Sequence, residues 1–177
     1  MPVNLGRKIM IVGSSGSGKS TLARQLGEIL RLPVIHIDKE MWKSGWVKTP
    51  QDEWREKHTA LISAPEWIID GNNPGNMDKR LETADTVIFL DFNRFVCLRS
   101  VLKRRLTYIG KPRPDVPEGC PETLFTDFDF IKYIWQYPVK SRPIVLDKIS
   151  KCEYIEFIHL KTRRMLNRFI NDRTPAV

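Results

Sequence analysis

One short pattern near the start of the chain limits its folding more than any other feature. Residues 13–21 read Gly-Ser-Ser-Gly-Ser-Gly-Lys-Ser-Thr, which matches the G-x-x-x-x-G-K-[S/T] phosphate-binding loop in full. An apolar run at 9–12 precedes this loop, and the stretch 22–30 after it has the apolar spacing of a helix. Because the loop requires a strand before it and a helix after it, this setting predicts nucleotide binding rather than a chance glycine-rich turn.

The residue types of the loop suit a triphosphate and a magnesium ion. Its glycines let the main chain curl so that N–H groups point inward, and the following helix adds its positive N-terminal end. Lys19 is expected to reach the β- and γ-phosphates and to act in catalysis, and Ser20 to ligate Mg²⁺. The sequence therefore predicts ATP and Mg²⁺ as cofactors, with the nucleotide held by Gly13, Ser14, Ser15, Gly16, Ser17, Gly18, Lys19, Ser20 and Thr21.

Apolar segments alternate with helical ones along the rest of the chain. Such β-α-β alternation predicts an α/β fold of the P-loop NTPase type, with a five-stranded parallel sheet flanked by helices. The length of 177 residues predicts a single domain over residues 1–177. Strands are expected at 7–12, 33–37, 67–69, 87–90 and 154–160, and helices at 22–30, 51–63, 95–102 and 163–170.

Aspartates follow three of the expected strands, at the edge of a parallel sheet where ligands gather. Asp70 ends an apolar strand and is expected to hold Mg²⁺ through its water; a turn or cap role is the alternative, and Asp91 is a rival for the metal. Asp38 follows the second strand, where a carboxylate could accept the proton of an attacking hydroxyl, which makes it a candidate catalytic residue. A helix cap or a partner for Lys39 is an equally good interpretation of Asp38.

The segment 107–122 holds prolines and glycines in a density that regular structure does not tolerate. A long irregular loop in a compact domain is often a lid over an active site. Arg104, Arg105 and Arg142 border this segment on its two sides. Because arginine side chains stabilise the charge that spreads over a moving phosphoryl group, these three are expected to act in catalysis.

Composition narrows the classes of partner. Lys and Arg number 29 against 21 Asp and Glu, giving a net charge of +8 that suits polyanions but is also common on an ordinary soluble surface. The three cysteines are far apart without a C-x-x-C pair, and the three histidines are scattered, so no zinc site or disulfide framework is indicated. No signal peptide and no apolar run long enough to span a bilayer is present. We expect a cytoplasmic monomer without a membrane partner.

Several motifs together resemble the bacterial DNA topology modulation protein (FlaR-like) family, which is related to adenylate kinase. They are the phosphate-binding loop, His36-Ile-Asp38, Trp42…Gly45-Trp46, Trp67-Ile-Ile-Asp-Gly-Asn72, Leu90-Asp-Phe92, Leu102-Lys-Arg-Arg105 and Lys140-Ser-Arg-Pro143. The resemblance implies a nucleoside-monophosphate-kinase-like fold with a segment that covers the acceptor (38–66) and a lid (107–140). It also implies that Asp70 lies near Mg²⁺, that Arg104 and Arg105 enter the lid beside ATP, and that Arg142 leaves it.

The sequence departs from adenylate kinases at one informative place. Adenylate kinases follow the Asp-Gly pair with Phe-Pro-Arg, whose arginine holds the AMP phosphate, whereas Asn72, Asn73 and Pro74 stand here and the nearest arginine is Arg80. A hydroxylated small molecule, with Asp38 as base, is therefore as good an acceptor as a nucleoside monophosphate.

These observations lead to one hypothesis and two alternatives. The hypothesis is a P-loop kinase that transfers the γ-phosphate of MgATP to a small-molecule or nucleotide acceptor. One alternative is a nucleotide-dependent DNA-binding protein that modulates DNA topology through a basic surface, although no nucleic-acid-binding motif supports it and any DNA binding is expected to be weak and nonspecific. Its residues would be Arg163, Arg164, Arg168 and the stretch 99–105. The other alternative is an ATPase without an acceptor.

Overall fold

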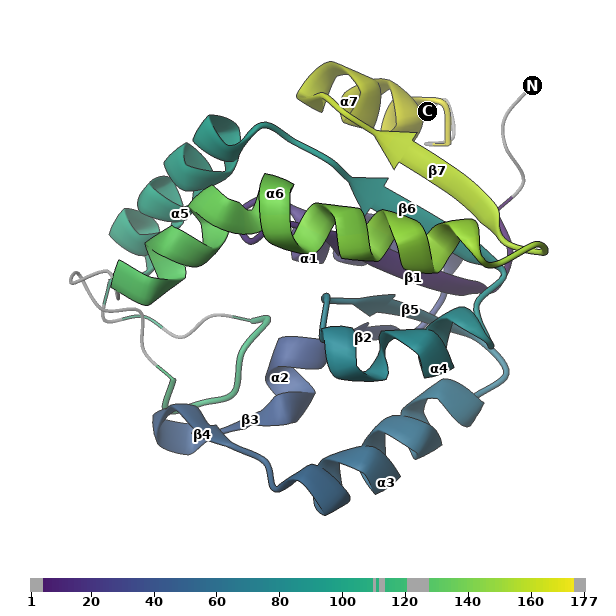
Figure 1. Ribbon diagram of the computed structural model, residues 1–177, viewed down its shortest axis with the longest axis horizontal. Coiled ribbons are helices and arrows are strands. Elements are labelled where there is room, and N and C mark those ends of the chain that lie inside the picture. Colours follow the sequence, from purple (N-terminus) through teal and green to yellow (C-terminus); the bar gives the residue numbers. More distant parts are fainter. Residues whose placement is uncertain (1–4, 110, 112–113, 121–127, 174–177) are drawn as a thin grey trace.

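A five-stranded parallel sheet forms the centre of the molecule. The computed structural model describes residues 5–109, 111, 114–120 and 128–173. The sheet has the strand order β2-β5-β1-β6-β7 (Figure 1), which confirms the predicted α/β architecture. Its strands are β1 (Lys8–Gly13), β2 (Val34–His36), β5 (Trp67–Asp70), β6 (Thr86–Leu90) and β7 (Glu156–Leu160).

Helices cover both faces of this sheet. On one face, α1 (Lys19–Leu30), α5 (Arg94–Tyr108) and α7 (Arg163–Asn171) bury apolar side chains against Ile9 and Ile11 of β1. On the other face, α3 (Gln51–Ser63), α4 (Met77–Leu81) and α6 (Phe128–Ser150) do the same against Met10 and Val12. Because successive strand residues point to opposite faces, the continuous apolar run of β1 serves both cores.

The register of the parallel strands brings their carboxyl ends to one edge. Ile11 of β1 lies opposite Asp70, Gly13 lies opposite Leu90, and His36 of β2 also lies opposite Asp70. The phosphate-binding loop leaves β1 at this same edge. Chemistry-bearing residues that are far apart in the sequence are therefore neighbours here.

Two elements differ from the sequence-based expectation. β2 stops at His36, and α2 (Ile37–Met41) begins at once, so Asp38 lies in the first turn of a helix rather than at a strand end. Helix α6, which is not among the helices expected above, begins in a stretch where Phe128, Ile131 and Trp135 have helical spacing, and it continues to Ser150 through Pro138 and Pro143. Burial of Tyr137, Val145 and Ile149 against the sheet offsets the two lost main-chain hydrogen bonds.

The remaining elements lie between β2 and α3 and before α4. A short hairpin follows α2, made of β3 (Trp42–Lys43), the 3₁₀ turn η1 (Ser44–Trp46) and β4 (Val47–Lys48). A second 3₁₀ turn, η2 (Pro74–Asn76), leads into α4. Residues 110, 112–113 and 121–127 of the expected lid lie outside the described residues. Within the part of the chain that is described, no helix has the length and apolar composition needed to cross a membrane.

Candidate active site

The chain between β1 and α1 is a tightly curled loop. Gly16 and Gly18 have positive φ angles of 80° and 99°, and the N–H of Ser17 donates to the carbonyl of Ser14 at 3.1 Å. A Cβ atom on residue 16 would lie 2.3 Å from the main-chain oxygen of Cys97 on α5, so only glycine allows this approach. The loop is thereby fixed against α5 in one conformation.

A cavity of about 230 Å³ opens over this loop and the start of α1. Four basic side chains and two acidic ones line it, a balance that suits a polyanionic ligand. The lining residues are Ser15, Gly16, Gly18, Lys19, Ser20, Thr21, Arg24, Asp38, Ser100, Arg104, Tyr108, Pro114, Asp115 and Arg163. Most of the loop residues predicted to bind nucleotide therefore line this one cavity, whereas the side chains of Ser14 and Ser17 are buried and do not line it.

Lys19, the first residue of α1, turns its ammonium group back toward the loop. Its Nζ donates to the carbonyl of Ser14 at 3.0 Å. Burial lowers the pKa of Lys19 below its ordinary value, and the nearby carboxylates of Asp38 and Asp70 oppose that shift. A partly desolvated ammonium group of this kind gains most from a phosphate oxygen as partner, because a charge-assisted hydrogen bond replaces the missing water.

Ser20, Asp70 and His36 form a chain of hydrogen bonds at the strand ends. The hydroxyl of Ser20 donates to Asp70 Oδ2 at 2.7 Å, and His36 Nδ1 lies 2.5 Å from Asp70 Oδ1. Sequence reasoning gave His36 no role; the register that places it opposite Asp70 becomes apparent only once the strands are paired. The serine and the carboxylate that were predicted to hold Mg²⁺ are thus brought together, with the histidine orienting the carboxylate from behind.

Ser20 and Asp70 fit magnesium better than a metal that is coordinated entirely by protein side chains. No group of three or more His, Cys, Asp or Glu side chains within the described ranges could hold a metal ion by itself. Magnesium in phosphoryl-transfer sites takes one or two protein oxygens and completes its shell with phosphate oxygens and water. One hydroxyl and one carboxylate beside a phosphate-binding loop match that requirement.

Asp38 lines the same cavity as Lys19, from α2. The negative charge of Asp38 acts to raise the pKa of Lys19 on α1, of Arg80 on α4 and of Tyr133 on α6. Asp38 therefore lies within electrostatic range of groups on these three helices. A carboxylate in this place can accept a proton from a group that is bound next to the phosphates.

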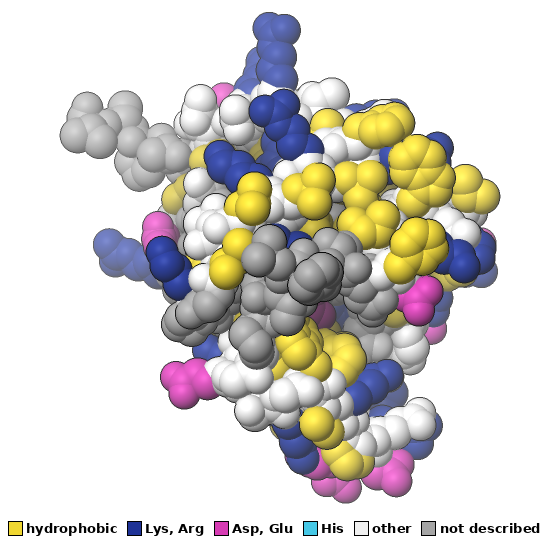
Figure 2. All heavy atoms as spheres, turned by 90° about the vertical axis from the view of Figure 1, so that its left-hand side faces the viewer, with side chains coloured by type: hydrophobic (Ala, Val, Ile, Leu, Met, Phe, Trp, Pro, Cys, Tyr) yellow, Lys and Arg dark blue, Asp and Glu magenta, His cyan; other side chains and the backbone are white. Residues whose placement is uncertain are grey.

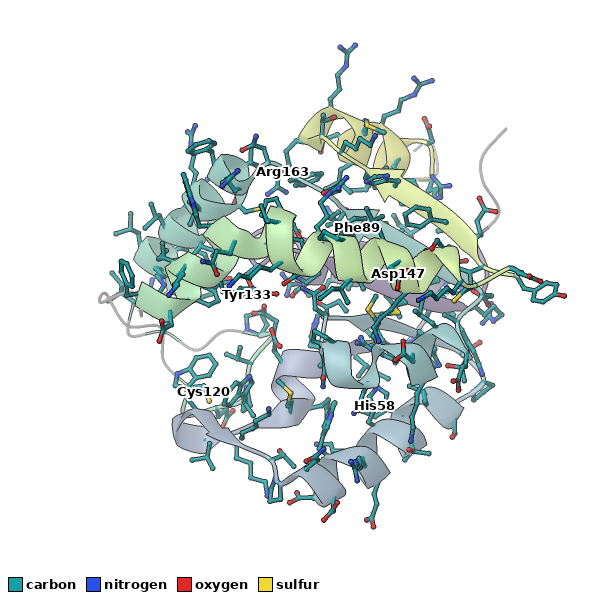
Figure 3. The ribbon with its side chains drawn as sticks, viewed as in Figure 1. His58, Phe89, Cys120, Tyr133, Asp147 and Arg163 are labelled. Atoms are coloured by element: carbon teal, nitrogen blue, oxygen red, sulfur yellow. The ribbon has the colours of Figure 1, made fainter. Side chains whose placement is uncertain are left out.

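Asn72 ties the end of β5 to the first residue of the phosphate-binding loop. Its side-chain oxygen accepts from the N–H of Gly13 at 3.0 Å, and its Nδ2 donates to the Gly13 carbonyl at 2.8 Å. The same Nδ2 lies 3.2 Å from the hydroxyl of Tyr133, which lies on the side of α6 that faces α2 (Figure 3). The sequence showed Asn72 only as part of a motif that departs from adenylate kinases, but the structure makes it a link between the loop and α6.

Of the three arginines predicted to act in catalysis, Arg104 lines the cavity and the other two lie elsewhere. The guanidinium group of Arg105 lies over the ring of Phe130, 5.6 Å from its centroid. Arg142 forms an ion pair with Asp91, with its Nε 2.9 Å from both carboxylate oxygens. Arg142 is therefore held at the end of β6 and is not among the residues that line the cavity.

Asp91, the rival metal ligand, is bonded to two basic side chains. Besides Arg142, His159 Nε2 lies 2.7 Å from Asp91 Oδ2. Burial raises the pKa of Asp91, but the hydrogen bonds from Arg142 and His159 outweigh burial and leave it below the ordinary value. The carboxylate that faces Ser20 is consequently that of Asp70 rather than Asp91.

Sequence reasoning missed two arginines that line the cavity. Arg163, the first residue of α7, reaches the phosphate-binding loop, where its Nη2 lies 3.2 Å from Ser100 Oγ and 3.5 Å from the Gly16 carbonyl. The start of α7 is fixed by Thr162, whose side chain accepts from the N–H of Met165. Arg24 of α1 is the second. The sequence had suggested Arg163 only as part of a DNA-binding surface, and it had given Arg24 no role.

The hairpin after α2 contacts the segment that leads from α5 toward α6. The N–H of Gly45 donates to the carbonyl of Gly119 at 2.9 Å, and the Cys120 thiol lies 3.3 Å from the carbonyl of Lys43. Pro114 and Asp115 of the same segment line the cavity. The expected acceptor-covering segment and the described part of the expected lid thus meet beside the β3–β4 hairpin, to the left of α2 in Figure 1.

The outer face of α5 mixes basic and apolar side chains. Figure 2 shows hydrophobic side chains gathered on this side of the molecule with Lys and Arg between them and around them. The exposed apolar residues of α5 and α6 include Phe95, Leu102, Leu106, Trp135 and Val139. The stretch 99–105 therefore does not form the continuous basic surface that nonspecific DNA binding uses.

Comparison with known proteins shows the fold. Solved structures of two shikimate kinases superpose on almost the whole chain: that from Acinetobacter baumannii in complex with shikimate (17% identity, 96% of each chain, TM-score 0.58) and that from Bacteroides thetaiotaomicron (16% identity, 93% of this chain and 94% of that one, TM-score 0.55). A gluconokinase from Sinorhizobium meliloti matches at 14% identity over 94% of this chain and 89% of its own, with a TM-score of 0.53. No protein-family model and no curated protein sequence matches. The chain has the fold of these P-loop kinases.

Proposed function

We propose that this protein transfers the γ-phosphoryl group of MgATP to a hydroxyl group of a small acceptor. The observation that carries the proposal is that the phosphate-binding loop with Lys19 and the carboxylate of Asp38 line one cavity. The fold shared with shikimate kinases and a gluconokinase supports it, because those proteins are named as kinases of small molecules.

In the proposed reaction, an acceptor oxygen attacks the γ-phosphorus, and the bond from that phosphorus to the β,γ-bridging oxygen breaks. ADP leaves with the electron pair of the broken bond, and Asp38 takes the proton of the acceptor hydroxyl. Lys19 and Arg104 would offset the charge that develops on the phosphates. A magnesium ion, for which Ser20 and Asp70 are the fitting ligands, would neutralise the β- and γ-phosphates when bound.

Four further points belong to this proposal: the use of ATP, the kinship with the topology modulation family, a covering role for residues 38–66 and a lid role for residues 107–140. They rest on the motifs of the sequence and on the contact between Gly45 and Gly119. DNA binding stays a prediction from the net charge of +8: it should be weak, nonspecific and lost as salt rises. A DNA titration at increasing ionic strength measures it.

The test is acceptor-dependent release of ADP by the wild type and by Asp38→Asn. The substitution keeps the size of the side chain and removes the base, so transfer should fall by roughly a hundredfold or more while MgATP affinity is retained. Normal transfer by Asp38→Asn would reduce Asp38 to a cap or an ion-pair partner. ADP release that no acceptor stimulates would instead favour the alternative of an ATPase.

A further inference from the structure

Helices α5 and α6 carry the same pattern of exposed side chains. An apolar residue is followed four positions later by a basic one, and seven and eleven positions later by apolar ones. In α5 these residues are Phe95, Arg99, Leu102 and Leu106, and in α6 they are Phe128, Lys132, Trp135 and Val139. Because positions three and four apart share one side of a helix, each helix presents an exposed apolar stripe with a basic residue within it.

The two stripes lie side by side, and we call the surface formed by these eight residues the α5–α6 face. Phe95 packs edge-on against Trp135, with ring centroids 5.5 Å apart, and the guanidinium of Arg94 lies 4.6 Å above the Trp135 ring. Toward the other end of α5, Arg105 lies over Phe130, so the two helices run antiparallel. Figure 2 shows hydrophobic side chains gathered on this side of the molecule with Lys and Arg between them.

The apolar side chains of the α5–α6 face project from the surface. The exposed fractions are 63% for Phe95, 69% for Leu106 and 71% for Val139. With roughly 100 Å² exposed by each of its six apolar side chains, the face reaches the size at which an apolar patch indicates a binding surface. A groove that receives a partner helix is concave, whereas projecting side chains suit a partner into which they can insert.

The charge around these side chains is positive. Helix α5 holds five Lys or Arg residues and no Asp or Glu. Arg99, Lys132 and the neighbouring Lys103 have exposed side chains, and Asp129 is the one acidic residue of α6 before Asp147. A second copy of the chain on this face would bring basic residues against basic residues, which like charges disfavour. The complementary partner is therefore negative at its surface and apolar below it.

We propose that the α5–α6 face binds the surface of a bilayer that contains anionic lipids. Its aromatic and aliphatic side chains would enter the boundary between headgroups and acyl chains, and Arg99, Lys103 and Lys132 would contact the lipid phosphates. Tryptophan is favoured at that depth because its ring is apolar while its N–H can reach water. Such a surface lies on a membrane and does not cross it, and the expectation of no membrane partner considered only spanning segments.

The opposite side of α5 belongs to the candidate active site. Ser100, Arg104 and Tyr108, which are four positions apart, line the cavity, and the main chain at Cys97 packs against Gly16 of the phosphate-binding loop. A bilayer on the α5–α6 face would therefore leave the loop open to nucleotide. Membrane and nucleotide are thus expected to bind at the same time.

The experiment is sedimentation of the whole chain with vesicles of phosphatidylcholine, either alone or with about one third phosphatidylglycerol. We expect the anionic vesicles to bind at least about tenfold more tightly, since each basic side chain near a charged surface is worth about fivefold in affinity. Raising the salt from about 0.1 M to about 0.5 M should weaken this binding because the Debye length shortens. A saturating nonhydrolysable MgATP analogue should leave it unchanged.

Leu106→Ser and Val139→Ser each remove one apolar side chain from one stripe. Because both side chains are exposed, the Tm should hardly change, while the vesicle partition coefficient should fall by roughly five- to tenfold in each variant. Lys132→Gln should lower it by about fivefold on the anionic vesicles. Tyr154→Ser is the matched control, because Tyr154 is exposed but precedes β7 at the opposite edge of the sheet, and it should leave the coefficient unchanged.

The proposal is overturned if anionic vesicles bind no better than neutral ones, or if Leu106→Ser loses no more binding than Tyr154→Ser. Displacement of the protein from vesicles by the MgATP analogue would also overturn it, because a lipid phosphate would then occupy the phosphate-binding loop. A dimer in sedimentation velocity that Leu106→Ser and Val139→Ser dissociate would make the face a contact between two copies instead. None of these outcomes bears on the proposed phosphoryl transfer.

Discussion

Replacing Asn72 by alanine tests how the phosphate-binding loop is held. The substitution removes the two hydrogen bonds between the Asn72 amide and the main chain of Gly13. An N–H left without a partner costs about 1–3 kcal/mol, and a second lost bond costs about 0.5–1.5 kcal/mol. The free energy of unfolding should therefore fall by about 2–4 kcal/mol, which corresponds to a Tm lower by roughly 5–15 °C for a chain of this size.

The same change should weaken nucleotide binding. Gly13 is the residue at which β1 ends and the loop begins, so a loosened Gly13 must be reordered when phosphate binds. We expect the Kd for a nonhydrolysable MgATP analogue to rise by roughly three- to tenfold, equivalent to about 1 kcal/mol. Urea denaturation measures the first effect and isothermal titration calorimetry the second.

Tyr133→Phe is the matched control, because it removes only the hydroxyl that Asn72 contacts on α6 and leaves both bonds to Gly13. It should cost less than about 1 kcal/mol, the usual net value of one hydrogen bond, and leave the Kd unchanged. The reasoning is refuted if Asn72→Ala is as stable as Tyr133→Phe and binds MgATP as tightly as the wild type.

Two further predictions concern arginines and a buried histidine. Arg104→Ala should lower kcat by roughly tenfold or more with little change in Tm, because Arg104 lines the cavity. Arg105→Ala should change kcat by less than about twofold, because the guanidinium of Arg105 lies over Phe130. Equal losses of kcat in the two variants would contradict this contrast. Burial, with the charges of Arg80 and Lys79, lowers the pKa of His58 to about 4 from an ordinary 6.5, so as pH falls between these values the unfolded chain takes up a proton that the folded chain does not. The free energy of unfolding should consequently drop by on the order of 3 kcal/mol from pH 6.5 to 4 because of His58. Urea denaturation of the wild type and of His58→Leu across this pH range should show this drop in the wild type and not in the variant. If the free energy of unfolding depends on pH in the same way in both proteins, His58 does not titrate on unfolding.

The sequence was most informative where one segment determines its own structure. The helix predicted at 51–63 has those bounds, and the strand ending at Asp70 was predicted to within one residue. Both follow from local signals: a proline at the helix entry, and an apolar run that ends in a carboxylate. Helix α6 was not among the expected helices because Pro138 and Pro143 are local signals for a helix end, and burial against the sheet overrides them.

Parts of the site that depend on distant contacts could not be predicted. Arg163 meets Gly16 across 147 residues of sequence, and Asn72 meets Gly13 across 59. Neither contact produces a periodic pattern in the sequence. Both depend on the strand order β2-β5-β1-β6-β7, and the alternation of strands and helices along the chain does not specify that order. Arg142 shows the converse case, since its position after the lid suggested catalysis but a long-range ion pair with Asp91 holds it at the end of β6.

The most direct test of the account is calorimetric titration of the wild type and of Lys19→Ala with a nonhydrolysable MgATP analogue. Lys19 is the fixed cation of the loop, and a charge-assisted hydrogen bond is worth about 1.5–3 kcal/mol. The account predicts tight binding by the wild type and a Kd raised by roughly ten- to a hundredfold or more in Lys19→Ala, with both proteins melting at similar temperatures. Equal affinity of the two folded proteins for the analogue would contradict the claim that this loop holds the phosphates of ATP.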